Sequence, residues 1–268
     1  MAGSADPDAD AGGAEGLSVD PAELAKFTAL AESWWDPAGQ FAPLHRLNPV
    51  RLAFVRDRAA ARFGRDPRAG RPLAGLRLVD IGCGGGLLAE PLARLGAEVT
   101  AIDAAARNIA VARIHAEQSG VAVDYRVATA ESLAEAGERY DIVLAMEVVE
   151  HVADLDAFLG AAVALLAPGG LLFLATLNRT AKAFALAVVG AEYVLRWLPR
   201  GTHDWRRFVR PSELAAALRR HGAAPREIKG VTYQPLADRW ALSPDVDVNY
   251  MMVARSAERD PDGKDRAI

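Results

Sequence analysis

The segment Leu78–Leu88, which reads LVDIGCGGGLL, constrains the fold of this chain more than any other. It places Asp80 at the end of an apolar strand, directly before Gly82, Gly84 and Gly86. A chain that turns sharply from a strand into a helix needs the backbone freedom of glycine, and a Cβ here would hold a bound group away from the backbone. The segment therefore predicts a nucleotide-type cofactor loop in an α/β fold.

The spacing of these glycines and the acids around them indicate which cofactor the loop suits. A dinucleotide fingerprint, G-x-G-x-x-G, lets a pyrophosphate rest on a helix N-terminus, but here the third glycine comes one residue early. Asp80 offers nothing to a phosphate but suits S-adenosylmethionine, which carries a sulfonium and an α-ammonium group. A second strand ends in Asp103, 21 residues after Gly82, where a carboxylate suits two ribose hydroxyls. We predict a methyltransferase site; the alternative is glycines that only allow tight helix packing beside two surface acids.

Length and charge indicate one enzyme-sized domain. With 268 residues, of which 51% are hydrophobic and 25% charged, the chain can bury one sizeable α/β core. Outside the first twenty residues 31 basic residues face 30 acidic ones, so nucleic acid is disfavoured as the main partner and we expect none. The single cysteine, Cys83, excludes an internal disulfide and a Cys-rich metal site, which is typical of a reducing compartment.

Both ends of the chain are expected to lie outside that domain. Residues 1–20 contain no Lys or Arg and no apolar segment, so we predict a disordered acidic tail, neither a secretory signal nor a presequence. Residues 256–268 predict a frayed charged tail. A single domain is expected over residues 21–255, with an insertion at about 179–210.

Apolar segments alternate in the βα rhythm of a Rossmann-like, doubly wound, mostly parallel sheet. Ligands of such sheets bind beyond the carboxyl ends of the strands. A helix over Pro211–His221 and a late antiparallel edge strand over Asp247–Arg255 complete the pattern. One helix is expected to begin at Leu87, and two others are expected over Asn108–Ser119 and near Leu155–Leu166. The other expected strands are Leu76–Ile81, Val99–Asp103, Val123–Val127, Tyr140–Met146 and Leu171–Leu177.

A helical prefix precedes the first strand. Asp20 has the position of an N-cap, with Pro21 and Glu23 placed as at a helix start. A second helix is expected over Val50–Phe63, after a loop over Pro43–Pro49. Whether the prefix only packs on the sheet or forms a lid over the cofactor stays open.

Three polar residues after the fourth strand are the candidates for catalysis. A phenol with a pKa of about 10 is only about 0.1% ionised at pH 7, a cost of roughly 4 kcal/mol that a base or a metal must offset. In MEVVEHV, Glu147, Glu150 and His151 would share one face of a helical turn. They could hold Mg²⁺ or another divalent cation, or His151 could act directly as the base. The alternative is that the carboxylates only cap a helix.

Other residues are candidates for cofactor contacts. Met146 ends the fourth strand and is expected to form a wall of the cofactor pocket. Residues 129–131 follow the third strand, where the adenine edge should lie. Arg51 could pair with the methionine carboxylate of the cofactor or could simply lie on the surface.

The insertion mixes apolar and aromatic residues with cations such as Lys182, Arg196 and Arg200. It is too short and too charged to cross a bilayer, but such a segment can lie at a membrane interface. We expect peripheral membrane contact through about 180–208; a buried cap over the active site is the alternative.

Several blocks of the sequence closely resemble one family, the bifunctional ubiquinone-biosynthesis O-methyltransferases. The resemblance runs from about Glu23 to Arg255 and includes VDIGCGGGLLAE, MEVVEHV, ATLNRT and DVDVNYMM. The glycine loop is shared by most class I methyltransferases, whereas the WWD, PLHRLNP and GAEYVLR…GTHDW blocks are specific to this family.

The resemblance implies O-methylation of two ring hydroxyls of polyprenylated catechol or quinol substrates, at separate steps of ubiquinone biosynthesis. By matching motifs it places cofactor contacts on Arg51, Gly82, Asp103 and Met146. It also places divalent-metal ligands on Glu147, Glu150 and His151, as described for eukaryotic members of the family.

It further suggests lipid contact through the insertion, and a lipid pathway makes association with neighbouring enzymes plausible. With no presequence evident, the expected place is the cytoplasm of a bacterium, at the inner face of its membrane. Competing interpretations are an O-methyltransferase for another phenolic acceptor, an NAD-dependent oxidoreductase, and a non-catalytic scaffold.

Overall fold

An eight-stranded sheet organises the computed structural model, which describes residues 16–186, 204–234, 237 and 239–256. Within these residues the strand order is β3-β2-β1-β4-β5-β8-β6-β7. The parallel strands are β1 (Arg77–Ile81), β2 (Glu98–Asp103), β3 (Asp124–Val127), β4 (Tyr140–Met146) and β5 (Leu166–Leu177).

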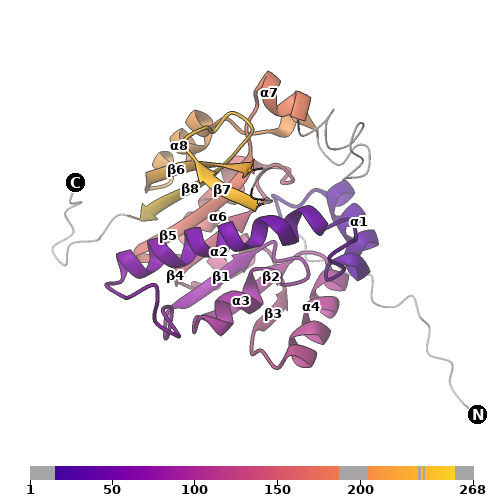
Figure 1. Ribbon diagram of the computed structural model, residues 1–268, viewed down its shortest axis with the longest axis vertical. Coiled ribbons are helices and arrows are strands. Elements are labelled where there is room, and N and C mark those ends of the chain that lie inside the picture. The colour runs from indigo at the N-terminus through magenta and orange to yellow at the C-terminus, as the bar shows by residue number, and fades with distance from the viewer. Residues whose placement is uncertain (1–15, 187–203, 235–236, 238, 257–268) are drawn as a thin grey trace, which may run out of the picture.

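The parallel part has the predicted doubly wound topology, with helices on both faces of the sheet (Figure 1). Because β2 and β4 lie on opposite sides of β1, the strand order reverses there and leaves a crevice at the carboxyl ends of these strands. Neighbouring residues of β1 enter different cores, with Leu78 on one face of the sheet and Val79 on the other. The connecting helices are α3 (Ala89–Arg94), α4 (Ala106–Ser119), α5 (Ala130–Glu135) and α6 (Leu155–Ala164).

The antiparallel side of the sheet contains more strands than expected. The predicted late strand is β8 (Asn249–Ser256), which pairs antiparallel with β5. Beyond it lie β6 (Ala223–Gln234) and the edge strand β7 (Arg239–Ser243), neither of which was predicted. Charged residues interrupt β6, so its sequence lacks the apolar runs that mark the central strands. The helix before β6, α8 (Pro211–Arg220), follows the prediction.

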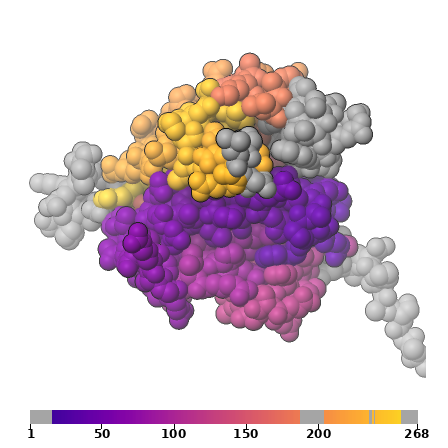
Figure 2. Space-filling view, viewed as in Figure 1, coloured from indigo at the N-terminus to yellow at the C-terminus, as the bar shows by residue number. Residues whose placement is uncertain are grey.

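The N-terminal prefix forms α1 (Pro21–Leu30), the short 3₁₀ helix η1 (Ala31–Ser33) and the long helix α2 (Ala42–Arg62). Asp20 caps α1 as predicted. The expected loop over Pro43–Pro49 is wrong, because Pro43 lies in the first turn of α2, where a missing N–H costs nothing, and Pro49 lies inside the helix. In Figure 2 this indigo prefix forms one surface with the gold β6–β7 hairpin.

Some predicted boundaries differ from the structure. Residues 16–20, expected in the tail, join the fold: the Ser18 N–H donates to Glu131 Oε1 at 3.2 Å, and the Ala153 N–H donates to the Ser18 carbonyl at 2.8 Å. At the other end, Ser256 still belongs to β8.

Of the expected insertion, residues 187–203 lie outside the described residues. Its described parts include α7 (Ala181–Ala183) and the 3₁₀ helix η3 (Trp205–Arg207). Among the described helices, none has the length and the apolar character needed to cross a bilayer.

Candidate cofactor and acceptor site

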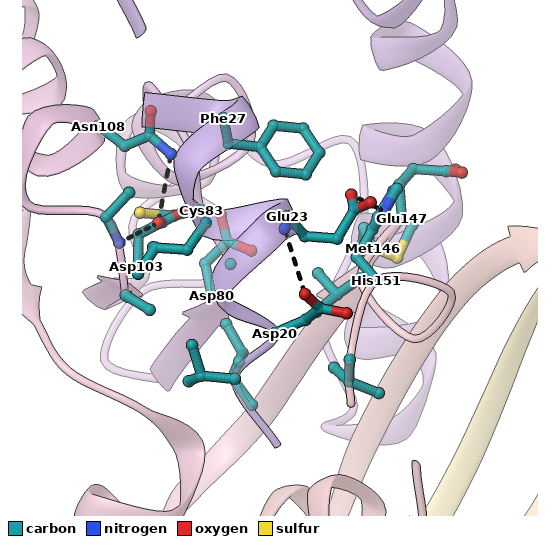
Figure 3. A pocket seen from close by; sticks show the side chains of 18 of the residues that line it. Asp20, Glu23, Phe27, Asp80, Cys83, Asp103, Asn108, Met146, Glu147 and His151 are labelled. Carbon is teal, nitrogen blue, oxygen red and sulfur yellow. Dashed lines mark hydrogen bonds and ion pairs between the residues drawn. The ribbon is translucent and has the colours of Figure 1, made fainter. Parts of the chain in front are cut away.

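A cavity of about 610 Å³ opens at the crevice in the parallel sheet. Its walls come from the glycine loop, the ends of β2 and β4, the turn after β4 and the inner face of α1. Figure 3 shows Asp80, Asp103 and Met146 around it, with Glu23 and Phe27 reaching in from α1. The cavity therefore lies where the strand order predicted a ligand.

The glycine loop requires glycine at the positions we singled out. Gly82, Gly84 and Gly86 have φ angles of 68°, 54° and 90°, which side-chain-bearing residues rarely adopt. A Cβ on Gly84 would also overlap the ring of Trp34, and one on Gly86 would overlap the Tyr125 hydroxyl. The backbone argument is therefore confirmed, with an addition: the protein's own aromatic side chains lie against this loop.

The carboxylate of Asp103 is held in place by three donors. Its oxygens accept hydrogen bonds from the N–H groups of Gly84 at 2.9 Å and Ala105 at 2.8 Å, and from Asn108 Nδ2 at 3.2 Å. The Asn108 Oδ1 accepts in turn from Trp34 Nε1 at 2.9 Å. Burial nevertheless raises the pKa of Asp103. A fixed carboxylate at the end of β2 suits the hydroxyls of a ribose.

Asp80 lies deeper, with 3% of its surface exposed. Its pKa is raised to about 7, chiefly because burial penalises the charged form; Arg51 lowers this pKa, and Asp103 raises it further. A cationic group in the cavity would favour the carboxylate form. A buried acid, Asp80, and a half-buried one, Asp103, at one cavity thus fit a ligand with positive charge.

Arg51 is buried beside the cavity rather than at the surface. Its side chain is 4% exposed, and its NH2 group donates to Glu147 Oε1 at 3.0 Å. The Nε of Arg51 is buried without a hydrogen-bond partner among the described residues. Since a buried donor without a partner is unfavourable, this guanidinium fits a ligand with a carboxylate. Together with the two acids it fits the amino-acid and ribose parts of S-adenosylmethionine.

The expected metal ligands do not come together. Residues 147–151 form a turn, not a helix face, in which Glu147 has a φ of 59° and the His151 N–H donates to the Val148 carbonyl. Each of the three side chains contacts a different partner: Glu147 contacts Arg51, Glu150 accepts from Thr176 Oγ1 at 2.8 Å, and His151 contacts Glu23. Across the described residues, no three His, Cys, Asp or Glu side chains are arranged to hold a metal.

Two titratable groups in this turn are perturbed. The pKa of Glu150 is raised to about 7, mainly by burial, with His151 opposing and Glu147 reinforcing the shift. Burial alone would lower the pKa of His151, but its hydrogen bond to Glu23 and the charge of Glu150 outweigh burial and raise it. His151 lines the cavity, so a ligand bound there would lie beside it.

Sequence reasoning missed the contribution of α1. Its Glu23 Oε2 lies 2.8 Å from His151 Nδ1, and the ring of Phe27 meets the His151 ring edge-on with 5.1 Å between centroids. The i, i+4 spacing of Glu23 and Phe27 shows that they share a helix face, but nothing in the sequence indicates what that face meets. Residues 129–131, expected near adenine, also line the cavity.

Comparison with known proteins places the chain in a family. Residues 46–228 match the family described as a methyltransferase domain. Two solved structures share the fold: a SAM-dependent methyltransferase from Thermotoga maritima, at TM-score 0.55 and 19% identity over 86% of this chain and 98% of that one, and the magnesium protoporphyrin IX methyltransferase of Synechocystis PCC 6803 with bound SAH, at TM-score 0.53 and 20% identity over 78% and 85%.

Closer relatives share most of the sequence. A ubiquinone biosynthesis O-methyltransferase of Paramagnetospirillum magneticum is 62% identical over 235 residues, which are 88% of this chain and 94% of the relative. The protein of the same name from Chelativorans sp. is 60% identical over 237 residues, again 88% and 94%. The chain belongs to the ubiquinone biosynthesis O-methyltransferase family.

Proposed function

We propose that this protein transfers the methyl group of S-adenosylmethionine to ring hydroxyls of polyprenylated catechol and quinol intermediates, at both O-methylation steps of ubiquinone biosynthesis. The names of relatives with about 60% identity support the pathway and the reaction. The cavity supports the cofactor, because the buried Asp80, the half-buried Asp103 and the buried guanidinium of Arg51 match its charges. An alternative acceptor, another phenolic small molecule, is tested below.

Five residues would hold the cofactor. Asp80 would face its cationic groups, Asp103 would accept from the ribose hydroxyls, and Arg51 would pair with its carboxylate. Gly82 leaves the backbone accessible, and Met146 forms an apolar wall. When bound, the cofactor supplies an electrophilic methyl group on a sulfonium. The protein adds orientation and exclusion of water, which favour a reaction in which opposite charges neutralise each other.

The mechanism rests on one observation: His151 lines the cavity, and its Nδ1 is hydrogen-bonded to the carboxylate of Glu23. An imidazole there can take the proton of a ring hydroxyl and so offset the roughly 4 kcal/mol needed to ionise it at neutral pH. The divalent cation that the resemblance implies is not part of this mechanism, because Glu147, Glu150 and His151 are committed to separate partners.

We also propose that the protein works at the inner face of the bacterial cytoplasmic membrane, through about 180–208. Phe184 and Leu186, at the start of this segment, are 44% and 55% exposed, and Arg206 and Arg207 lie at its end. A prenyl chain left in the bilayer saves about 0.8 kcal/mol per CH₂. Association with other enzymes of the pathway is part of the same proposal.

The test is methyl transfer from labelled S-adenosylmethionine to a short-chain 3-demethylubiquinol and, separately, to a soluble phenol, with EDTA and then with added Mg²⁺. We expect turnover in EDTA, and a loss of roughly 10²–10⁴-fold in His151→Ala with unchanged cofactor affinity. His221→Ala, which alters a histidine on α8's C-terminal cap, is the matched control and should keep full activity.

Each contrary result has a distinct meaning. Turnover that EDTA abolishes and Mg²⁺ restores would show that a metal activates the acceptor. Transfer only to soluble phenols would establish the alternative acceptor. Normal cofactor binding without any transfer would favour a non-catalytic role.

A further inference from the structure

The first helix of the fold supplies a carboxylate to the imidazole at the cavity. Glu23 lies on α1 and His151 in the turn after β4, 128 residues apart in the sequence, yet Glu23 Oε2 is 2.8 Å from His151 Nδ1. Both side chains are mostly buried, with 24% and 18% exposed. A contact over this separation depends on how α1 docks, which no local sequence pattern dictates.

We infer that Glu23 is a positioning residue for His151, so that α1 completes the active site rather than only covering it. This inference rests on the proposed role of His151 as the base. A carboxylate only accepts hydrogen bonds, so the Nδ1 that contacts Glu23 must carry the proton. In the neutral ring the lone pair is then on Nε2, the nitrogen that does not contact Glu23, and in the proposed mechanism this nitrogen meets the acceptor.

This tautomer is the one that the reaction needs. Nε2 takes the hydroxyl proton while the ring oxygen forms its bond to the methyl carbon. The electron pair of the broken sulfur–carbon bond stays on sulfur, which becomes a neutral thioether, and His151 later releases its proton to solvent. An imidazole with its proton on Nε2 could not begin this step, so fixing Nδ1–H removes an unproductive form.

Several contacts hold Glu23 in place. Asp20 caps α1 through the N–H groups of Ala22 at 2.9 Å and Glu23 at 3.3 Å, and its other oxygen accepts from Arg207 at 2.6 Å. One turn after Glu23, Phe27 packs edge-on against the same imidazole. The ring of His151 is thus confined by a hydrogen bond and an aromatic contact from one helix.

Other charges face this pair. Lys26 Nζ lies 3.6 Å from the Glu23 carboxylate, and the charge of Glu150 acts on His151 from its own turn. Lys26 accompanies Glu23 on α1, and its charge also acts on His151, in the direction opposite to that of Glu23. The direct hydrogen bond is therefore the feature to remove.

The experiment compares Glu23→Gln, His151→Ala and the double variant in the methyl-transfer assay with cofactor affinity measured in parallel. Gln keeps the shape of Glu but can also donate to Nδ1 and so permit the wrong tautomer. We expect kcat to fall about 100-fold in Glu23→Gln, with the affinity for S-adenosylmethionine within about twofold of the original. The double variant should be no slower than His151→Ala alone, because Glu23 acts only through His151.

The control is Glu32→Gln, the same substitution on the same prefix. Glu32 makes an exposed ion pair with Arg107 at 3.0 Å, and neither residue lines the cavity, so activity should be retained. A second readout is the ¹⁵N NMR signal of the His151 imidazole, assigned by its absence in His151→Ala. We expect Nδ1–H in the original protein and a mixture of tautomers in Glu23→Gln.

The variants distinguish an error in the role of His151 as the base from an error in the positioning role of Glu23. If His151→Ala keeps full turnover, the base itself is misassigned. If His151→Ala is inactive but Glu23→Gln keeps full kcat or the same tautomer, the positioning role is overturned. Additive losses in the double variant would also overturn it, because they would show that Glu23 only anchors α1.

Discussion

The protonation state of one buried carboxyl group, that of Asp80, affects how strongly this site binds its ligand. Asp80 has a pKa of about 7 because burial disfavours its charged form, so near neutral pH it is only partly ionised. A buried carboxyl group of this kind lowers the stability of the unliganded fold, and it is tolerated where a bound ligand offsets that loss. Asp80 could be found from sequence because it ends a strand before glycines, but the depth of its burial could not.

At the residue scale we predict that the affinity for S-adenosylmethionine rises with pH and levels off above about pH 7. A cationic ligand favours the carboxylate, so below its pKa Asp80 must release a proton before binding, and affinity should change up to about tenfold per pH unit there. Calorimetry between pH 5.5 and 8.5, in buffers with different ionisation enthalpies, would measure the released proton.

The matched variant is Asp80→Asn, which cannot titrate. It should bind the cofactor more weakly at pH 8 and lose most of the pH dependence. An unchanged pH profile in this variant would show that another group is responsible.

Among the elements, the prefix is tied to the glycine loop by two tryptophans. Trp34 stacks on Phe41 with 3.8 Å between ring centroids and donates to Asn108, while Trp35 Nε1 donates to the Gly85 carbonyl at 2.8 Å. The prefix therefore does more than pack on the sheet. It fixes the loop and, through Asn108, the carboxylate of Asp103.

We predict that Trp34→Phe weakens cofactor binding by about tenfold without unfolding the protein. The aromatic ring over the loop remains, but Asn108 loses its buried donor, which costs about 1–3 kcal/mol. Equilibrium binding and thermal melting measured together would separate the two effects. Trp240→Phe, on the edge strand β7, is the control and should bind the cofactor normally; equal weakening in both would contradict the role of the Asn108 bond.

An element could be predicted from the sequence when residues within the element itself determine it, and could not when contacts with distant residues determine it. The parallel strands and the glycine loop follow from apolar runs and φ > 0 positions, which are properties of short segments. In contrast, α2 continues through 43–49 because side chains hold it from outside: Asn48 donates to the Leu87 carbonyl, and His45 contacts the Trp34 carbonyl. The Glu147–His151 turn likewise follows from contacts with Arg51 and Glu23, distant in sequence.

In the whole molecule, the cavity is bounded by the prefix on one side and the carboxyl ends of the parallel strands on the other (Figure 3). A ligand between them contacts only the folded state. At a concentration of 100 times its Kd it stabilises the fold by about 2.7 kcal/mol. For a chain of this size that corresponds to a rise in Tm of roughly 5–10 °C.

We therefore predict that saturating S-adenosylmethionine raises Tm by several degrees, measured by scanning calorimetry. NADH at the same concentration should leave Tm unchanged, because the site carries acids where a dinucleotide has phosphates. Asp103→Ala should lose the shift, since its carboxylate is expected to bind the ribose. Stabilisation by NADH alone would revive the oxidoreductase interpretation.

The contacts of α1 also bear on how the protein is made. Asp20 and Arg207 are 187 residues apart, and Glu23 and His151 are 128 apart. Forming contacts across such separations costs loop-closure entropy and comes late in folding. On the ribosome, α1 is synthesised long before His151 and Arg207, so it cannot form these contacts until most of the sheet has been made. A nascent chain ending before Arg207 would thus contain every residue of the proposed cofactor site and still lack the ion pair that anchors α1.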